Sequence, residues 1–174
     1  MRLAVLSDVH ANIHALEPVL EQIEATDFDR VLCLGDVVGY GAFPNEVVEF
    51  LEASGVEMLR GAYDEAIVVG KRQRDGELDS ELERVEKLSY LWTLRELTPD
   101  NRAFLRSLPR ELNLPLRKGP PLFATHRLSR SGGESPSEFG ADWLLRDVAA
   151  RVGPCLLLCG HTHVPGDRLV DGLR

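Results

Sequence analysis

The chain has 174 residues and a mass of 19.4 kDa, which suits a single domain, and we find no linker that would divide residues 1–174. Its 28 Asp and Glu exceed its 20 Lys and Arg, and the resulting net charge of −8 argues against an extended nucleic-acid-binding face. An apolar fraction of 44% excludes a disordered chain, and no apolar run approaches the roughly 20 residues of a membrane span.

The N-terminal third alternates short β-rich runs with amphipathic stretches. Strands are predicted over Arg2–Ser7, Arg30–Leu34 and Val56–Arg60. Helices are predicted between them, over Asn12–Ala25 and over residues 44–54, where Pro44 stands at the start and Gly55 follows the end. This β-α-β-α-β order predicts a parallel sheet with right-handed crossovers.

The remaining elements are mainly helical up to residue 108. Helices are predicted over Ser80–Leu97 and Thr98–Leu108, followed by a hairpin of strands Leu112–Leu116 and Leu122–Thr125. A last helix, Glu138–Val152, leads to a strand over Cys155–Cys159. Trp92 and Trp143 are expected in the core. The cysteines lie in apolar runs and the N-terminus lacks a secretory signal, so we expect reduced thiols, a cytoplasmic protein and no membrane partner.

Histidine and aspartate residues gather directly after the predicted strands. Loops at the carboxyl ends of strands form the binding sites of open α/β sheets, so we expect these side chains to meet. Imidazoles and carboxylates together suit a divalent cation, and this number of ligands suits two ions about 3.5–4 Å apart that share a carboxylate. The alternative is a set of unrelated surface and capping residues. The residues are Asp8, His10, Asp36, His126, His161 and His163.

The same residues stand in a series of motifs that resembles the calcineurin-like metallophosphoesterase family in its compact bacterial and archaeal form. The resemblance implies an α/β fold, a four-layer αββα sandwich of two mixed sheets. It also implies one metal held by Asp8, His10, Asp36 and His163, with Asp36 bridging to a second metal on His126 and His161. Mn²⁺ is expected, with Fe, Zn or Ni as alternatives. The motifs are Asp8-Val9-His10, residues 35–41 (GDVVGYG), residues 60–65 (RGAYDE), Thr125-His126 and residues 160–163 (GHTH).

The third motif departs from the family's usual Gly-Asn-His-Asp/Glu. Ala62 stands where the Asn would ligate the second metal, so the resemblance predicts a weakened second position. Tyr63 replaces the His and is expected to orient the substrate, with Asp64 beside it as a further catalytic residue. Only 11 residues follow His163, where relatives continue with further strands. We expect a short C-terminus and a sheet edge that a partner or a second copy of the chain covers.

These observations predict a metal-dependent phosphoesterase that hydrolyses a phosphodiester or a small phosphomonoester through a dinuclear site. The partner is then a small phosphorylated substrate. The alternative is a binding scaffold that keeps the fold but has reduced turnover, which Ala62 and Tyr63 favour and the six intact ligands oppose. A metal-dependent hydrolase of C–N bonds is a third reading, and the Gly35-Asp36 and Gly160-His161 contexts speak against it.

Overall fold

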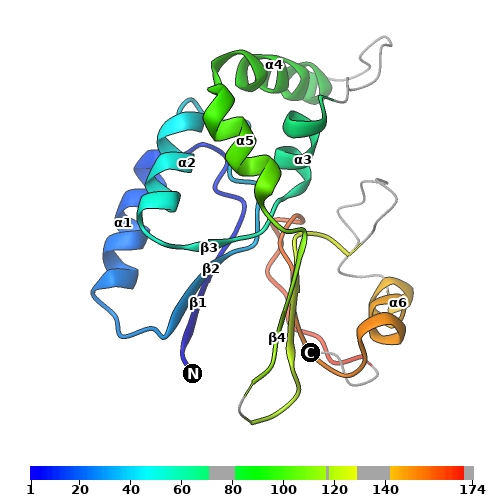
Figure 1. The fold of residues 1–174 in the computed structure, drawn as a ribbon. Helices are drawn as coiled ribbons and strands as arrows, with labels where there is room; N and C mark the ends of the chain where they lie inside the picture. Colours follow the sequence, from blue (N-terminus) through cyan, green and yellow to red (C-terminus); the bar gives the residue numbers. More distant parts are fainter. Residues whose placement is uncertain (71–80, 117, 129–141, 171–174) are drawn as a thin grey trace.

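The computed structural model describes residues 1–70, 81–116, 118–128 and 142–170. Two three-stranded sheets lie face to face, with helices on both outer sides (Figure 1). The N-terminal sheet contains β1 (Leu3–Leu6), β2 (Arg30–Cys33) and β3 (Glu57–Met58), which α1 (Ile13–Glu24) and α2 (Pro44–Ala53) connect. The C-terminal sheet contains β4 (Glu111–Leu114), β5 (Leu122–Thr125) and β6 (Leu156–Leu158), with α6 (Asp142–Val152) between β5 and β6.

The two sheets differ in strand direction. In the N-terminal sheet the order is β1-β2-β3 and both pairs are parallel, with Leu3 opposite Arg30 and Leu32 opposite Glu57. In the C-terminal sheet β4 and β5 form the predicted antiparallel hairpin, whereas β5 and β6 run parallel across the α6 crossover. The αββα sandwich is therefore confirmed, and its described N-terminal strands are parallel, as the β-α-β-α-β order of that region predicts.

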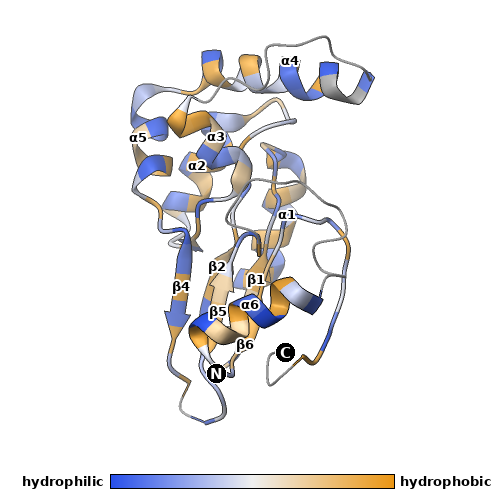
Figure 2. Cartoon of the chain, turned by 90° about the vertical axis from the view of Figure 1, so that its right-hand side faces the viewer, coloured by the Kyte–Doolittle hydropathy of each residue, from blue (hydrophilic) through white to orange (hydrophobic). Residues whose placement is uncertain are grey.

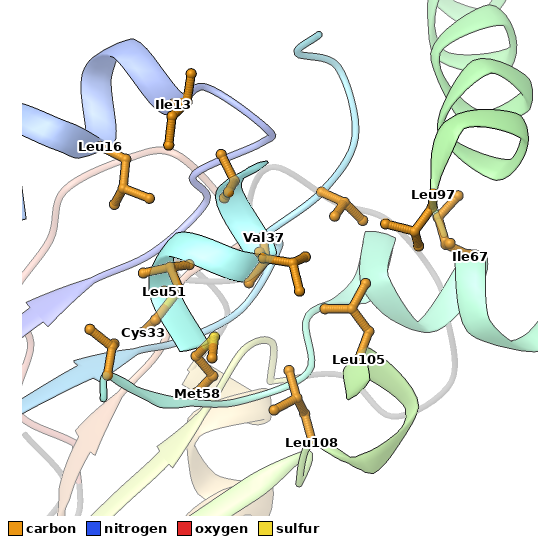
Figure 3. Close-up of a cluster of buried hydrophobic side chains, with 14 of the residues drawn as sticks. Ile13, Leu16, Cys33, Val37, Leu51, Met58, Ile67, Leu97, Leu105 and Leu108 are labelled. Carbon is orange, nitrogen blue, oxygen red and sulfur yellow. The ribbon is translucent and has the colours of Figure 1, made fainter. Parts of the chain in front are cut away.

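Three apolar clusters fill the spaces between the four layers. Leu32, Leu122 and Ala124 point between the sheets, while their neighbours Cys33 and Phe123 point outward to the helices. This follows from the alternation of side chains along a strand. The largest cluster joins α1 and α2 to the N-terminal sheet and continues through Val37 to Leu105 and Leu108 (Figure 3). All three cysteines are free thiols.

Three helices stand beyond the ends of β1 and β2, at the top of Figure 1: α3 (Ala62–Val69), α4 (Glu81–Glu96) and α5 (Pro99–Ser107). The predicted helices over 80–97 and 98–108 correspond to α4 and α5, whereas α3 was not predicted. Its eight residues AYDEAIVV lack a long amphipathic period, and Gly70 ends it in the left-handed region.

The prediction that Trp92 and Trp143 are core residues is wrong, since their exposed fractions are 40% and 68%. Helix α4 contacts the body through Tyr90, Thr93 and the following Leu97, which are buried, and Trp92 lies off this face. Helix α6 likewise buries Leu144, Leu145 and Val148 rather than Trp143. Residues 138–141 of the predicted last helix lie outside the described residues.

The two edge strands of the C-terminal sheet differ in polarity. Strand β4, which carries hydrophilic stretches in Figure 2, alternates Glu111 and Asn113 with Leu112 and Leu114. The opposite edge strand, β6, consists of three leucines. None of the helices among the described residues has the length and apolarity that a membrane crossing requires.

Candidate metal centre

The loops after β1 and β2 are joined by main-chain hydrogen bonds that place Asp8 and His10 beside Asp36. The amide of Asp8 donates to the carbonyl of Gly35 at 2.9 Å, and the amide of His10 donates to the carbonyl of Asp36 at 2.9 Å. A third bond, from the Ala11 amide to the Val37 carbonyl, is 2.8 Å long. The parallel ladder of the sheet is thus continued into the loops, and the three side chains share one rigid frame.

Most of the predicted ligands have strained backbones. A positive φ is uncommon outside glycine and costs roughly 1–3 kcal/mol, so it persists only where the surrounding structure enforces it. Such strain clusters at functional sites. Five of the six predicted metal ligands have this conformation, namely Asp8 (56°), His10 (49°), Asp36 (51°), His161 (74°) and His163 (53°).

Asp8, His10 and His163 form a first group whose ligand atoms all lie within 4.8 Å of one another. His163 Nε2 is 3.2 Å from Asp8 Oδ1 and 3.2 Å from His10 Nε2. Two ligands bound at about 2.1 Å to one ion lie about 3.0–3.4 Å apart, so these separations fit a shared cation. The other ring nitrogen of His10, Nδ1, donates to the Val38 carbonyl at 3.3 Å. This bond leaves the Nε2 lone pair directed at the group.

Asp36, His126 and His161 form a second and more deeply buried group, also within 4.8 Å. His126 Nδ1 donates to the Leu34 carbonyl at 3.1 Å, which directs Nε2 toward Asp36 Oδ2 at 3.2 Å. His126 Nε2 and Asp8 Oδ1 are buried without a well-aligned hydrogen bond in the described parts of the chain, and the atoms 3.2 Å from them, Asp36 Oδ2 and His163 Nε2, belong to other ligands. Buried polar atoms are normally satisfied, so these two atoms point to a missing ligand between the groups.

Asp36 faces both groups. Its Oδ2 lies 3.2 Å from His126 Nε2 and 3.9 Å from His10 Nε2, while its Oδ1 accepts a 2.6 Å bond from the Tyr63 amide. Burial raises the pKa of Asp36, but His126 and His10 outweigh this effect and hold the pKa below its usual value. Burial is also the main reason why the pKa of His10 is lowered, which favours its neutral, ligating form. Imidazole and carboxylate donors are those that Mn²⁺, Fe and Zn accept, so the residues fit the predicted ions.

Asp64 is a positioning residue and not part of either group. It is fully buried at the start of α3, where Oδ1 accepts from the amides of Val37 and Val38 at 3.0 and 3.1 Å and Oδ2 accepts from Gly61 at 2.9 Å. Burial, followed by the charge of Asp36, raises the pKa of Asp64 to about 6. Asp64 therefore fastens α3 to the loop that carries Asp36.

Two glycines allow close approaches at the site. A Cβ on Gly61 would overlap the main-chain nitrogen and the Oδ1 of Asp36, so only glycine lets α3 begin here. A Cβ on Gly160 would overlap Ser7 Oγ and lie 2.7 Å from Asp8 Oδ2. With glycine at position 160, Asp8 Oδ2 accepts a hydrogen bond from the amide of His161 at 3.1 Å. This bond joins the loop after β6 to the loop after β1.

Tyr63 lies beside the first group with its hydroxyl turned to α4. Its ring centroid is 6.0 Å from that of His10, and its hydroxyl lies 3.1 Å from Ser89 Oγ and 3.3 Å from the Glu86 carbonyl. Tyr40 completes this wall, since its ring meets His10 edge-on at 4.8 Å. Sequence reasoning missed Ser89 and Glu86, because neither residue stands in a motif of the predicted helix over 80–97.

The structure brings all six predicted ligands together in two groups, with Asp36 in the group of His126 and His161 and 3.9 Å from His10 of the other group. The whole chain, residues 1–174, matches the calcineurin-like phosphoesterase superfamily domain. The chain belongs to this family. Ala62 then marks a departure of this member, since it begins α3 in a pocket wall that also contains His126.

Individual relatives support the assignment. The chain is 31% identical to the uncharacterised protein MJ0912 of Methanocaldococcus jannaschii over 165 residues, which are 94% of this chain and 63% of the relative. A crystal structure of a metallophosphoesterase from Sphaerobacter thermophilus is 31% identical, with a TM-score of 0.63 over 95% of this chain and 62% of that one. The hypothetical protein PH1004 of Pyrococcus horikoshii shares the fold, with 24% identity and a TM-score of 0.70 over 94% of this chain and 70% of that one. The chain thus spans less than two thirds of the first two relatives.

Proposed function

We propose that the protein hydrolyses a phosphoester through two divalent metal ions held by its two ligand groups. The observation that carries this proposal is the packing of six ligand side chains into two adjacent groups, in which the buried atoms Asp8 Oδ1 and His126 Nε2 lie 3.2 Å from other ligand atoms. When bound, two such ions lower the pKa of a water molecule and neutralise phosphoryl oxygens. Mn²⁺ is the ion we expect, and two ions are proposed because one tetrahedral ion would not use six ligands.

The contacts of each ligand indicate its proposed role. Asp36 is the proposed bridging ligand, because its Oδ2 faces His126 and His10 while the Tyr63 amide fixes its Oδ1. His10 and His126 are held in the ligating tautomer by main-chain carbonyls. His163 is the most exposed ligand, with 56% of its side chain accessible, so the phosphoryl group is expected to enter on its side.

The substrate is proposed to be a small phosphorylated molecule, either a phosphodiester or a phosphomonoester, and the compartment to be the cytoplasm. A second copy of the chain remains the proposed partner. Tyr63 is proposed to orient the substrate through its ring, because Ser89 and Glu86 occupy its hydroxyl and burial raises its pKa further above 10.

Turnover of bis(4-nitrophenyl) phosphate and of 4-nitrophenyl phosphate tests the proposal. Activity is expected with Mn²⁺, is lost in EDTA and returns with added metal. His161→Ala is expected to abolish it, whereas His14→Ala serves as a matched control. His14 contacts Phe43 on the surface and lies outside both groups. Metal-independent turnover, or equal loss in both variants, would contradict the proposal.

A binding scaffold with reduced turnover is the second candidate. Two observations favour it: Ala62 offers no ligand beside His126, and the hydroxyl of Tyr63 is engaged with α4. The scaffold predicts metal binding without turnover of either ester, and the enzyme predicts both.

A further inference from the structure

A pocket of about 850 Å³ opens beside the second ligand group. Its wall includes Ala62 and His126, so it adjoins the proposed metal centre, and it also carries Arg60, Arg110, Arg127 and Glu65. The helix α3, the junction between α5 and β4, and the end of β5 supply these residues. This volume lies within the range of small-molecule sites, which is about 300–1,000 Å³, and exceeds what one phosphate needs.

The charge of this pocket is opposite to that of the whole chain. Glu65 is shared by two of the arginines, because Arg60 Nε lies 2.7 Å from Oε2 and Arg110 Nη2 lies 2.6 Å from Oε1. The remaining acid in the wall, Glu111, pairs with Arg151 at 2.6 Å. In a protein with a net charge of −8, the pocket therefore has a local excess of guanidinium groups.

Within the described part of the chain, Arg127 is the arginine of this pocket that interacts with Glu65 by charge but forms no ion pair with it. Among residues 1–70, 81–116, 118–128 and 142–170, no carboxylate lies within ion-pairing distance of its guanidinium. Its main-chain carbonyl accepts from Thr125 Oγ1 at 3.1 Å, which fixes the chain directly after His126. Arg127 is thus held one residue from a proposed metal ligand, and an anion would displace no ion pair that its charged group makes among the described residues.

We propose that this pocket binds a second anionic group of the substrate, with Arg127 and Arg110 as its recognition residues. The inference rests on the proposed function, since it assumes that the phosphoryl group occupies the metal centre. Glu65 holds Arg110 through Nε and Nη2, and this leaves the other terminal nitrogen of Arg110 for a ligand. The substrate class is therefore a phosphoester that carries a carboxylate or a further phosphate at a distance from the reacting phosphorus.

Calorimetric titration tests this with alkylphosphonates of three to six carbons, with and without a terminal carboxylate. Their P–C bond is not hydrolysed, and the series of chain lengths covers a range of distances between the metal centre and the arginines of the pocket. With Mn²⁺ present, at least one carboxylate probe is expected to bind about tenfold more tightly than its neutral counterpart, as one charge-assisted hydrogen bond allows. Arg127→Gln should remove most of this preference, and Arg127→Lys should retain part of it. Arg95→Gln, a matched change on exposed α4, should leave it unchanged.

Equal affinity for the charged and neutral probes at every length would overturn the inference, as would a preference that survives in the Arg127→Gln, Arg110→Gln double variant. The same titrations in EDTA separate this result from the proposed function. If the chain hydrolyses no ester but keeps an Arg127-dependent preference for the carboxylate probes without metal, the proposed function fails and the anion pocket stands. If turnover is metal-dependent but the preference is absent, the reverse holds.

Discussion

Replacement of Gly61 by alanine tests how closely α3 must approach Asp36. The new Cβ would overlap the nitrogen and Oδ1 of Asp36 and lie 2.8 Å from its Cα, where ordinary contacts begin at 3.4 Å. The overlap with the nitrogen is the deepest, so helix α3 must then retreat by at least about 1 Å. The bond from the Tyr63 amide to Asp36 and that from the Gly61 amide to Asp64 both span this contact. We expect a loss of about 1–3 kcal/mol in the free energy of unfolding, as for other overpacked sites.

The larger effect is expected on metal binding, because Asp36 loses the amide that orients it. Loss of such supporting contacts typically costs 10–100-fold in affinity. Calorimetric Mn²⁺ titration of the EDTA-treated protein measures this, and urea unfolding in EDTA measures stability. The control is Gly55→Ala, which meets no atom within 4 Å but has a φ of +66°. It should cost about 1 kcal/mol and leave Mn²⁺ affinity unchanged. Unchanged affinity in Gly61→Ala would refute the argument that this contact positions the bridging ligand.

Three further predictions follow from the ligand groups. Asp36→Asn should reduce turnover more than any other single change, because Asp36 faces both groups; a clearly larger loss in His10→Ala would show that the bridge is misassigned. After dialysis the chain should retain one ion and lose the other, since the second group lacks a ligand at Ala62. Two retained ions per chain, measured by elemental analysis, would contradict this. Ala62→Asn should increase turnover most at low Mn²⁺, and a metal titration without a shift to lower concentration would mean that residue 62 does not face the metals.

The sequence predicted the layers well, because the hydrophobic pattern of each strand is local. The strand Leu122–Thr125 was predicted to the residue, and Asn12 and Thr98 were recognisable as helix starts, where each accepts a bond from the first turn. Helix α3 was missed because its eight residues contain no amphipathic period, and its position depends on the contact with Asp36. Which residues of α4 are buried depends on the face that packs against the rest of the protein, and the sequence of the helix alone does not identify this face.

The sequence predicted the site residues that directly follow strands, but not the side-chain contacts between segments that are far apart in the chain. All six ligands lie in loops that follow strands, and the packing of the two sheets brings the loops after β1 and β2 to those after β5 and β6. The backbone strain at those ligands has no sequence signal, since only Gly35 and Gly160 mark the turns. The contacts of Tyr63 with Ser89 and of Glu65 with Arg110 link residues that lie 26 and 45 positions apart, so they required the tertiary structure.

The central claim is that two metal ions flank Asp36, and an anomalous difference map of Mn²⁺-soaked crystals tests it most directly. The account predicts two peaks, one bounded by Asp8, His10 and His163 and a weaker one bounded by His126 and His161, with Asp36 Oδ2 between them. The absence of any peak within bonding distance of Asp36 at saturating Mn²⁺ would contradict it.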